Sequence, residues 1–414
     1  MSRSRSPTTE GTKTMLDTVT VLDVTQVVSG SFASMTLADM GADVMKIERP
    51  TGGDVGRHNP PYVDDFSSYF ASVNRNKRSV SLNLKSDEGA ELFLKLAEDA
   101  DVVVENFRPG AMERFGIDYE AVAERNPKII YCSISGFGQE GPYAEYPALD
   151  IIAQAMSGNM SITGPPDSKP YRSGIPIADI AGSMYAVQGI LGALFRRERT
   201  GEGQYVDVSM LDCMLSWLTV RAGYTFATDE PYPRMGNKLD EFVPYGVFET
   251  ADSYLAIVVV QDHHWEKLCT AIGRPELATD DRFQTADQRR ENRDELESIL
   301  EDELVTQSTD EWFDVMSNHG VPSGPIYDTK EVWEDDHVNH REILSSIQLG
   351  DEELSVVDHP VKYADDTTGI TRGVPRVGED TYETLERMGY TEAEVAELIE
   401  CGVVGSPETS HPER

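Results

Sequence analysis

Short apolar runs alternate with amphipathic segments through the first half of the chain, and this alternation predicts the fold. Helix-period segments cover residues 32–40, 90–98 and 111–115, each lying between two apolar runs. The apolar runs are rich in β-branched residues and predict strands at 18–24, 43–47, 78–84, 101–104, 128–134 and 205–209. Because strands that alternate with helices form parallel sheets, we predict an α/β fold with a doubly wound, Rossmann-like sheet.

The most apolar segment, 171–199, predicts one long helix with Pro176 in its first turn. No charged residue occurs at 180–195, so we expect this helix to be buried on most sides. The one acidic residue near its start is Asp179, which has two interpretations. It is either a helix N-cap or a nucleophilic carboxylate that the helix N–H groups keep ionised. The local sequence leaves both open.

The composition changes near residue 226, where the regular alternation of strands and helices ends. We predict a disordered leader at 1–14 and a large domain whose first part is 15–225. A smaller α+β domain follows at 226–330, and 331–414 forms a linker and a C-terminal return to the large domain. Near the end of the chain, Thr391 and Glu394 have the spacing of a capping box.

The charge is strongly one-sided, since 36 Lys and Arg against 73 Asp and Glu give a net charge of −37. The acids are scattered along the chain, which indicates a halophilic protein in a cytosol of very high salt. Such a surface argues against nucleic acid and anionic membranes as partners. The 4 cysteines are isolated and form no CxxC, which predicts a cytoplasmic protein without a disulfide frame or a metal site. No run of about 18 apolar residues free of glycine and charge predicts a membrane span.

One glycine pattern imitates a dinucleotide-binding fingerprint. Gly136, Gly138 and Gly141 follow a predicted strand with GxGxxG spacing, but Pro142 and Pro147 prevent the helix that the fingerprint needs. We therefore predict no nicotinamide or flavin cofactor. The turn is instead a flexible loop above the carboxyl edge of the sheet, where it can cover a ligand.

Motifs between residues 18 and 403 resemble the class III CoA-transferase family, which includes formyl-CoA transferase, carnitine CoA-transferase and α-methylacyl-CoA racemase. They occur in the family order as LDVTQVVSG, GADVMKIERPTGGD, NRNKRSVSLNL, ADVVVENFRPGAMERFG, SISGFGQEGPY, PIADIAGSMYAVQGILGAL, RTGEGQYVDVSM, RENRDELESIL, GVPSGPIYD and VGEDTYETLERMGY. The resemblance implies that an acyl-CoA and a small carboxylic acid are the substrates and that no cofactor is tightly bound. It also implies an interlocked homodimer.

The resemblance also places functional residues at matching positions of this chain, with Asp179 as the nucleophile. The CoA contacts that it implies are Val28, Ser29, Arg49, Leu82, Asn83, Lys85, Asn106, Phe107, Arg108, Arg114 and Asp150. The cations among them suit the phosphates of CoA, whereas a single basic residue is by default a solvated surface charge. Pro147 departs from the family pattern, which has a basic residue there.

Two further groups complete the predicted site. Backbone N–H groups of Gly136 and Gly138 are expected to stabilise oxyanions, each contributing about 3 kcal/mol. The residues predicted to contact the acceptor acid are Arg172, Arg221, Gly236 and Asn237. The two arginines either hold a second carboxylate or pair with surface acids. The two others belong to the loop 235–243, which matches a glycine-rich flap of the family but holds one glycine.

Leu149 separates two activities that the family performs. Racemases of the family have a histidine at this position to exchange a proton with the substrate, and leucine cannot do so. We therefore predict CoA transfer through an aspartyl anhydride and an aspartyl-CoA thioester. A non-catalytic CoA-binding protein is the other alternative, against which the retained Asp179 argues. By analogy with the family, we expect succinyl-CoA as donor and a C5 dicarboxylate such as mesaconate as acceptor.

Overall fold

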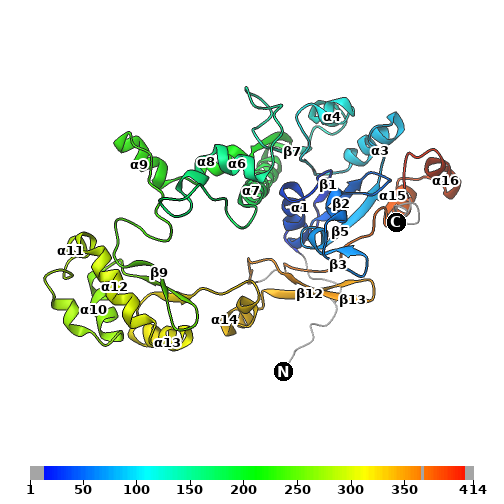
Figure 1. The fold of residues 1–414 in the computed structure, drawn as a ribbon. Helices are drawn as coiled ribbons and strands as arrows, with labels where there is room; N and C mark the ends of the chain where they lie inside the picture. Colours follow the sequence, from blue (N-terminus) through cyan, green and yellow to red (C-terminus); the bar gives the residue numbers. More distant parts are fainter. Residues whose placement is uncertain (1–13, 365–367, 406–414) are drawn as a thin grey trace. The chain divides into compact units, whose positions relative to one another are not determined.

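The computed structural model describes residues 14–364 and 368–405, which form two compact units (Figure 1). As far as it is described, the large unit comprises Met1–Asn159, Arg172–Gly223 and Glu342–Arg414. The small unit comprises Met160–Tyr171 and Tyr224–Arg341. The range 226–330, predicted as a small domain, falls within the second unit. The predicted leader lies outside the described residues, except for its last residue, Thr14.

A six-stranded parallel sheet forms the centre of the large unit. The strands are β1 (Thr20–Asp23), β2 (Asp43–Glu48), β5 (Lys77–Ser81), β6 (Val102–Glu105), β7 (Ile130–Ser135) and β8 (Gln204–Ser209). Their order is β5-β2-β1-β6-β7-β8, and all neighbours run parallel. The doubly wound sheet is thus confirmed. Its direction of winding reverses between β1 and β6, the point where such sheets open a crevice at their carboxyl edge.

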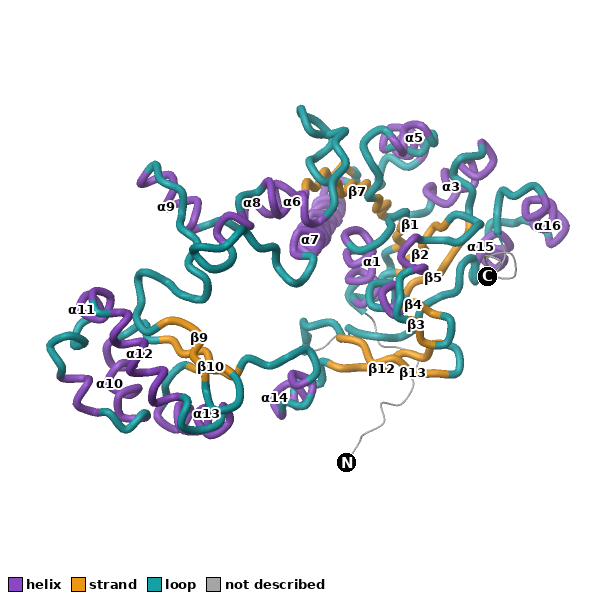
Figure 2. The backbone as a smooth tube through the Cα atoms, viewed as in Figure 1, coloured by secondary structure: helices purple, strands orange, loops and turns teal. Residues whose placement is uncertain are grey.

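Helices cover both faces of this sheet (Figure 2). The residues of β1 alternate between two cores, with Val21 in the first and Leu22 in the second. The helices of the first core are α1 (Ser29–Asp39), α7 (Ile177–Thr200) and α8 (Met210–Ser216). Those of the second are α3 (Asp87–Glu98), α5 (Tyr119–Arg125), α15 (Thr381–Arg387) and α16 (Glu392–Glu400). The predicted capping box of Thr391 and Glu394 begins α16.

Helix α7 is the predicted long helix, but it is less buried than its sequence suggests. It packs closely on β7 and α8 at Gly182, where an added Cβ would lie 3.1 Å from Met210 Cγ and 3.4 Å from Ile134 Cγ2. Its opposite side is open, with Met184 46% and Phe195 61% exposed. The expectation of burial on most sides is therefore wrong for a single chain. Because the middle of this helix carries no charge on any side, its sequence does not indicate which face of the helix the rest of the chain covers.

By length and composition alone, α7 is the one described helix that could cross a membrane. Half of its most apolar window is buried inside the large unit. The criterion is therefore weak evidence for a membrane span.

The apolar stretch 211–225, whose sequence would suit a single helix, lies in two helices, α8 and α9 (Val220–Thr228). Thr219 between them has φ 39°, a left-handed conformation that a helix cannot continue. An antiparallel sheet of β9 (Tyr245–Glu249), β10 (Tyr254–Val258) and β11 (Ser323–Pro325) belongs to the small unit. Its core contains Leu255 and Trp265, on β10 and on α10 (Asp262–Ala271), with α12 (Arg293–Leu304) and α13 (Thr309–His319) packed alongside.

The remaining elements lie in both units. They are β3 (Tyr62–Val63), β4 (Phe66–Ser67), α2 (Ser68–Ala71), α4 (Ala111–Arg114), α6 (Asp150–Met156), α11 (Ala286–Glu291), α14 (Asp336–His340), β12 (Leu344–Leu349) and β13 (Glu352–Val357). Four 3₁₀ segments complete them at Val55–His58, Asn159–Ile162, Pro275–Thr279 and Glu331–Trp333.

Candidate active site

A cavity of about 470 Å³ opens at the carboxyl edge of the large sheet, between the segments that follow β1, β2, β5 and β6. Five of the predicted CoA contacts line it, namely Arg49, Leu82, Asn83, Lys85 and Phe107. The ring of Phe107 meets that of Phe115 edge to face, with centroids 6.1 Å apart, and gives the cavity an apolar wall. Residues far apart in the sequence thus converge at the sheet edge where α/β proteins bind ligands.

The cations predicted to contact CoA are exposed and lack carboxylate partners. Several other arginines of the large unit are paired with carboxylates, as Arg57 is with Glu48 and Arg125 with Glu91. Within the described residues, no ion pair involves any of the four predicted cations, which are Arg49, Lys85, Arg108 and Arg114. In a chain with 73 acids against 36 bases, such cations are available to an anionic ligand.

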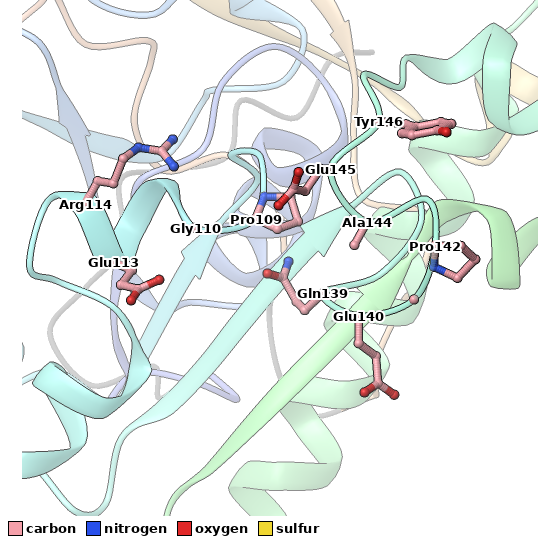
Figure 3. A pocket seen from close by; sticks show the side chains of 11 residues that line it. Pro109, Gly110, Glu113, Arg114, Gln139, Glu140, Pro142, Ala144, Glu145 and Tyr146 are labelled. Carbon is pink, nitrogen blue, oxygen red and sulfur yellow. The ribbon is translucent and has the colours of Figure 1, made fainter.

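Arg114 lines a second cavity of about 810 Å³, beside α4 and the loop after β7 (Figure 3). The same lining contains three acids, Glu113, Glu140 and Glu145. Arg108 lines a third cavity of about 220 Å³. The predicted phosphate contacts therefore divide among three cavities, and the one around Arg114 is acidic overall, which opposes a phosphate there.

Asn106 acts on the protein itself. Its Oδ1 accepts the N–H of Gln26 at 2.8 Å, and its Nδ2 donates to the Gln26 carbonyl at 2.8 Å and to Ser29 Oγ at 3.1 Å. These bonds clamp the turn between β1 and α1, which carries the predicted contacts Val28 and Ser29. Within this turn Val27 has φ 63°, a conformation that costs a β-branched residue about 1–2 kcal/mol. Asn106 therefore shapes the turn rather than presenting its amide to a ligand.

A buried charge network, which the sequence analysis missed, supports the same turn. Lys46 and Lys77 are fully buried, and their Nζ atoms lie 3.9 Å and 2.9 Å from Asp23 Oδ2. Lys46 also lies 2.9 Å from Asp54 Oδ2, while Asp54 Oδ1 accepts the N–H of Val27 at 3.2 Å. Burial lowers the pKa of Lys77 to about 8, and the two lysines hold the pKa of Asp23 below its usual range despite burial. The sequence signal that could have revealed this network is a lysine inside an apolar strand, as in DVMKI.

Asp179 occupies the third position of α7, partly buried, so the N-cap interpretation of it is wrong. The N-cap position is held by Pro176, with no side-chain cap. No hydrogen bond among the described residues reaches the Asp179 carboxylate. Burial, together with the charge of Asp150, raises the pKa of Asp179 to about 7. The helix N–H groups therefore do not keep it ionised.

The carboxylate that accepts hydrogen bonds from N–H groups at the start of α7 is that of Asp150. Its Oδ1 accepts the backbone N–H of Ala178 at 2.8 Å and of Asp179 at 3.4 Å. Its Oδ2 accepts Nε2 of Gln154 at 2.7 Å, and Gln154 Oε1 accepts the N–H of Ser173 at 2.9 Å. Asp150 was predicted to contact CoA, whereas here both of its oxygens are occupied by the protein.

Tyr69 is a further residue that sequence reasoning missed. It lies in α2, where burial, and after it the charge of Asp179, raises the pKa of the phenol. Its ring packs beside Gly56, whose Cβ position is 3.6 Å from two ring carbons. The segment between β2 and β5 carries no periodic signal, so the approach of Tyr69 to α7 depends on the tertiary fold.

The glycine loop after β7 differs in part from the expectation. The N–H of Gly138 donates to Ser135 Oγ at 2.9 Å, so it is engaged within the turn and is not a free oxyanion donor. Gly136 faces Ala148, and a Cβ on Gly136 would lie 2.1 Å from the Cβ of Ala148. The loop therefore packs against the segment that leads to Asp150.

The residues predicted to contact the acceptor acid lie in both units. In the large unit, Arg172 donates to the carbonyls of Ser173 and Gly174, and Arg221 lies in α9. In the small unit, the N–H of Gly236 donates to the Gly164 carbonyl at 2.9 Å, and Asn237 follows it. Gly236 has φ 61°, which fixes a turn at this point of the predicted flap.

Comparison with known proteins shows the family of this chain. The model of CoA-transferase family III matches residues 16–381, and the chain belongs to this family. It is an enzyme that transfers CoA from an acyl-CoA to a carboxylic acid.

Two relatives and one structure illustrate the similarity. The chain is 42% identical over 386 residues to succinyl-CoA:mesaconate CoA-transferase of Haloarcula hispanica, covering 90% of this chain and 96% of that protein. It is 45% identical over 316 residues to acetyl-CoA:oxalate CoA-transferase of Acetobacter aceti, covering 76% and 81%. A CAIB/BAIF family protein from Brucella suis has a similar structure, with a TM-score of 0.85, 35% identity and coverage of 91% and 99%.

Proposed function

We propose that Asp179 is the nucleophile of the transfer. Its carboxylate attacks the thioester carbonyl of the donor, the C–S bond breaks, and CoA leaves as the thiolate while an aspartyl mixed anhydride forms. The thiolate then attacks the aspartyl carbonyl, which releases the donor acid and leaves an aspartyl-CoA thioester. The acceptor carboxylate takes CoA by the reverse steps. The observation that carries this proposal is a partly buried carboxylate, without a hydrogen-bond partner of its own, at the start of α7 in a family III chain.

A carboxylate with a raised pKa suits this role. Because nucleophilicity rises with basicity, Asp179 attacks more readily when ionised than a solvated aspartate would. The cavity lined by Arg49, Lys85 and Phe107 is the proposed seat for part of CoA, with the free cations for phosphate and the phenyl ring for an apolar portion. CoA thioesters are substrates here, and we infer that no cofactor is tightly bound.

We infer succinyl-CoA as donor and mesaconate, or another small dicarboxylate, as acceptor. The similarity to the Haloarcula enzyme and the net charge of −37, which suits a halophilic cytoplasm, support this pair. Leu149 supports transfer over racemisation, since it replaces the base that racemisation needs. It lies at the start of α6 and is 73% exposed.

We also propose a homodimer. Apolar side chains are exposed on three helices of the large unit, among them Ile151 on α6, Met184 on α7 and Leu215 on α8. Exposed apolar side chains on several helices suit an interface, and the family resemblance implies an interlocked one. Sizing at high salt tests this, and a monomer under those conditions would contradict it.

The nucleophile is tested by trapping. Incubation with succinyl-CoA followed by hydroxylamine should inactivate the enzyme and convert Asp179 to a hydroxamate detectable by peptide mass spectrometry. Asp179→Ala should abolish transfer to mesaconate while the dissociation constant for CoA stays within about twofold. A hydroxylamine-resistant enzyme, or an active Asp179→Ala variant, would exclude the covalent mechanism. A panel of other dicarboxylates in the same assay identifies the preferred acceptor.

A further inference from the structure

We propose that Asp150 is a positioning residue for the nucleophile: its carboxylate, locked by Gln154, fixes the first turn of α7 and with it the place of Asp179. The inference rests on the proposed role of Asp179. It concerns hydrogen bonds that lie entirely within the large unit, where α6 begins, where the chain re-enters at 172–176, and where α7 begins.

The first step of the argument is the missing cap. Pro176 provides no side chain that can accept from the first N–H groups of α7, which would otherwise lack partners. Asp150 supplies the acceptor from outside the helix, through Oδ1 to the N–H groups of Ala178 and Asp179. The carboxylate therefore replaces an N-cap and completes the positive end of the α7 dipole.

The second step is the lock on Asp150. Gln154 lies one turn further along α6 and is fully buried. Its amide bonds Asp150 Oδ2 at one end and the N–H of Ser173 at the other, so a single side chain ties α6 to the chain that leads into α7. A satisfied network around a buried side chain such as Gln154 holds one geometry.

The third step is the effect on the nucleophile. Because Asp150 takes the helix N–H groups, none of them stabilises the ionised Asp179, and the two like charges oppose each other. The other titratable group that faces Asp179 is Tyr69 from α2. Where α7 meets β7 and α8 the neighbours are Ile134 and Met210, and α1 contributes the Ser29 carbonyl, which accepts from Ser183 Oγ. Burial therefore raises the pKa of Asp179, and the nearby charge of Asp150 raises it further.

Three variants of Asp150 separate positioning from charge. Asp150→Asn removes the charge at constant size, so the acidic limb of the kcat/KM profile, measured from about pH 5 to pH 9, should move to lower pH. Asp150→Ala removes the cap and should lower kcat by about tenfold or more, with the CoA dissociation constant within about twofold. Asp150→Ser keeps a short acceptor and should recover part of kcat, because serine caps helices well.

Asp335 offers the matched control. Its Oδ1 caps α14 by accepting the N–H groups of His337 and Val338, both at 2.9 Å. Asp335→Asn and Asp335→Ala should leave kcat and the pH profile unchanged, although they remove a helix cap as their Asp150 counterparts do.

The outcomes are distinct. A CoA dissociation constant that rises in step with the loss of kcat would make Asp150 a CoA contact and overturn the proposal, as would an unmoved acidic limb in Asp150→Asn. If Asp150→Ala does not fold, the isosteric Asp150→Asn still tests the effect on Asp179. An active Asp179→Ala variant would instead sink the proposed function, whereas an inactive one beside wild-type-like Asp150 variants would sink this inference alone.

Discussion

Gly136 lies so close to Ala148 that a Cβ added to Gly136 would be 2.1 Å from the Cβ of Ala148. Real Cβ atoms do not approach so closely, so Gly136→Ala must displace either the loop after β7 or the segment leading to Asp150. We expect kcat to fall by about tenfold or more, because a displacement near 1 Å at a reacting group has effects of this size. Steady-state kinetics measure it. Gly324→Ala, where nothing lies within 4 Å of the added Cβ, is the control and should be active.

The pH dependence of stability should report on Asp179. Its folded-state pKa of about 7 lies above the usual 3.8, so the folded protein binds the proton more tightly than the unfolded chain. The contribution of Asp179 to the free energy of unfolding is therefore most favourable below pH 3.8. It falls as the pH rises from 3.8 to about 7, and it stays reduced above about 7. Asp179→Asn should raise stability by about 2 kcal/mol at pH 8, roughly half of the full shift because the side chain keeps some solvent contact. The difference in stability between Asp179→Asn and the wild type should vanish near pH 4. If the two proteins have equal Tm values at both pH 4 and pH 8, the raised pKa of Asp179 is contradicted.

Loss of Asp23 should be severe. Asp23→Ala would leave Lys46 and Lys77, both fully buried, without their shared carboxylate. Breaking a buried ion pair by removing one partner destabilises a protein by about 3–5 kcal/mol. Urea unfolding of the large unit measures the change. Asp43→Ala, which breaks the partly exposed pair with Arg78, should cost less than about 1 kcal/mol and serves as the comparison.

The free cations should govern CoA affinity. Arg49→Ala and Lys85→Ala should each weaken CoA binding by about tenfold, as expected when one charge-assisted contact to phosphate is removed. Calorimetry with CoA and with its 3′-dephospho form identifies which phosphate each residue meets. Arg125→Ala removes an exposed arginine already paired with Glu91 and should leave binding unchanged. Unchanged affinity in both variants would show that the 470 Å³ cavity does not hold phosphate.

The sequence predicted well those features that depend on local periodicity. The six strands of the large sheet and the capping box at Thr391 are encoded within a few residues, and all are present. The break between α8 and α9 was not predictable, because Thr219 carries no breaker signal and takes its left-handed conformation from its surroundings.

The sequence predicted which residue types form the site, but it did not predict their pKa values or their hydrogen-bond partners. The position of Asp179 at the start of a helix suggested a low pKa, yet a distant acceptor, Asp150, had already taken the helix donors. Tyr69 and the partners of Lys46 depend on contacts across segments that no single stretch encodes. Long-range pairing decided each of these properties.

The path of the chain between the units has a consequence for biosynthesis. The stretch 160–171, which belongs to the small unit, is made more than fifty residues before the rest of that unit, and the last part of the large unit follows all of it. On edge strand β5, the backbone N–H groups of Ser79 and Ser81 donate hydrogen bonds to the side-chain oxygens of Asp380 and Thr381. A ribosome must therefore release nearly the whole chain before this edge is covered. Nascent chains carry an open sheet edge throughout synthesis, which is where chaperones would be expected to bind.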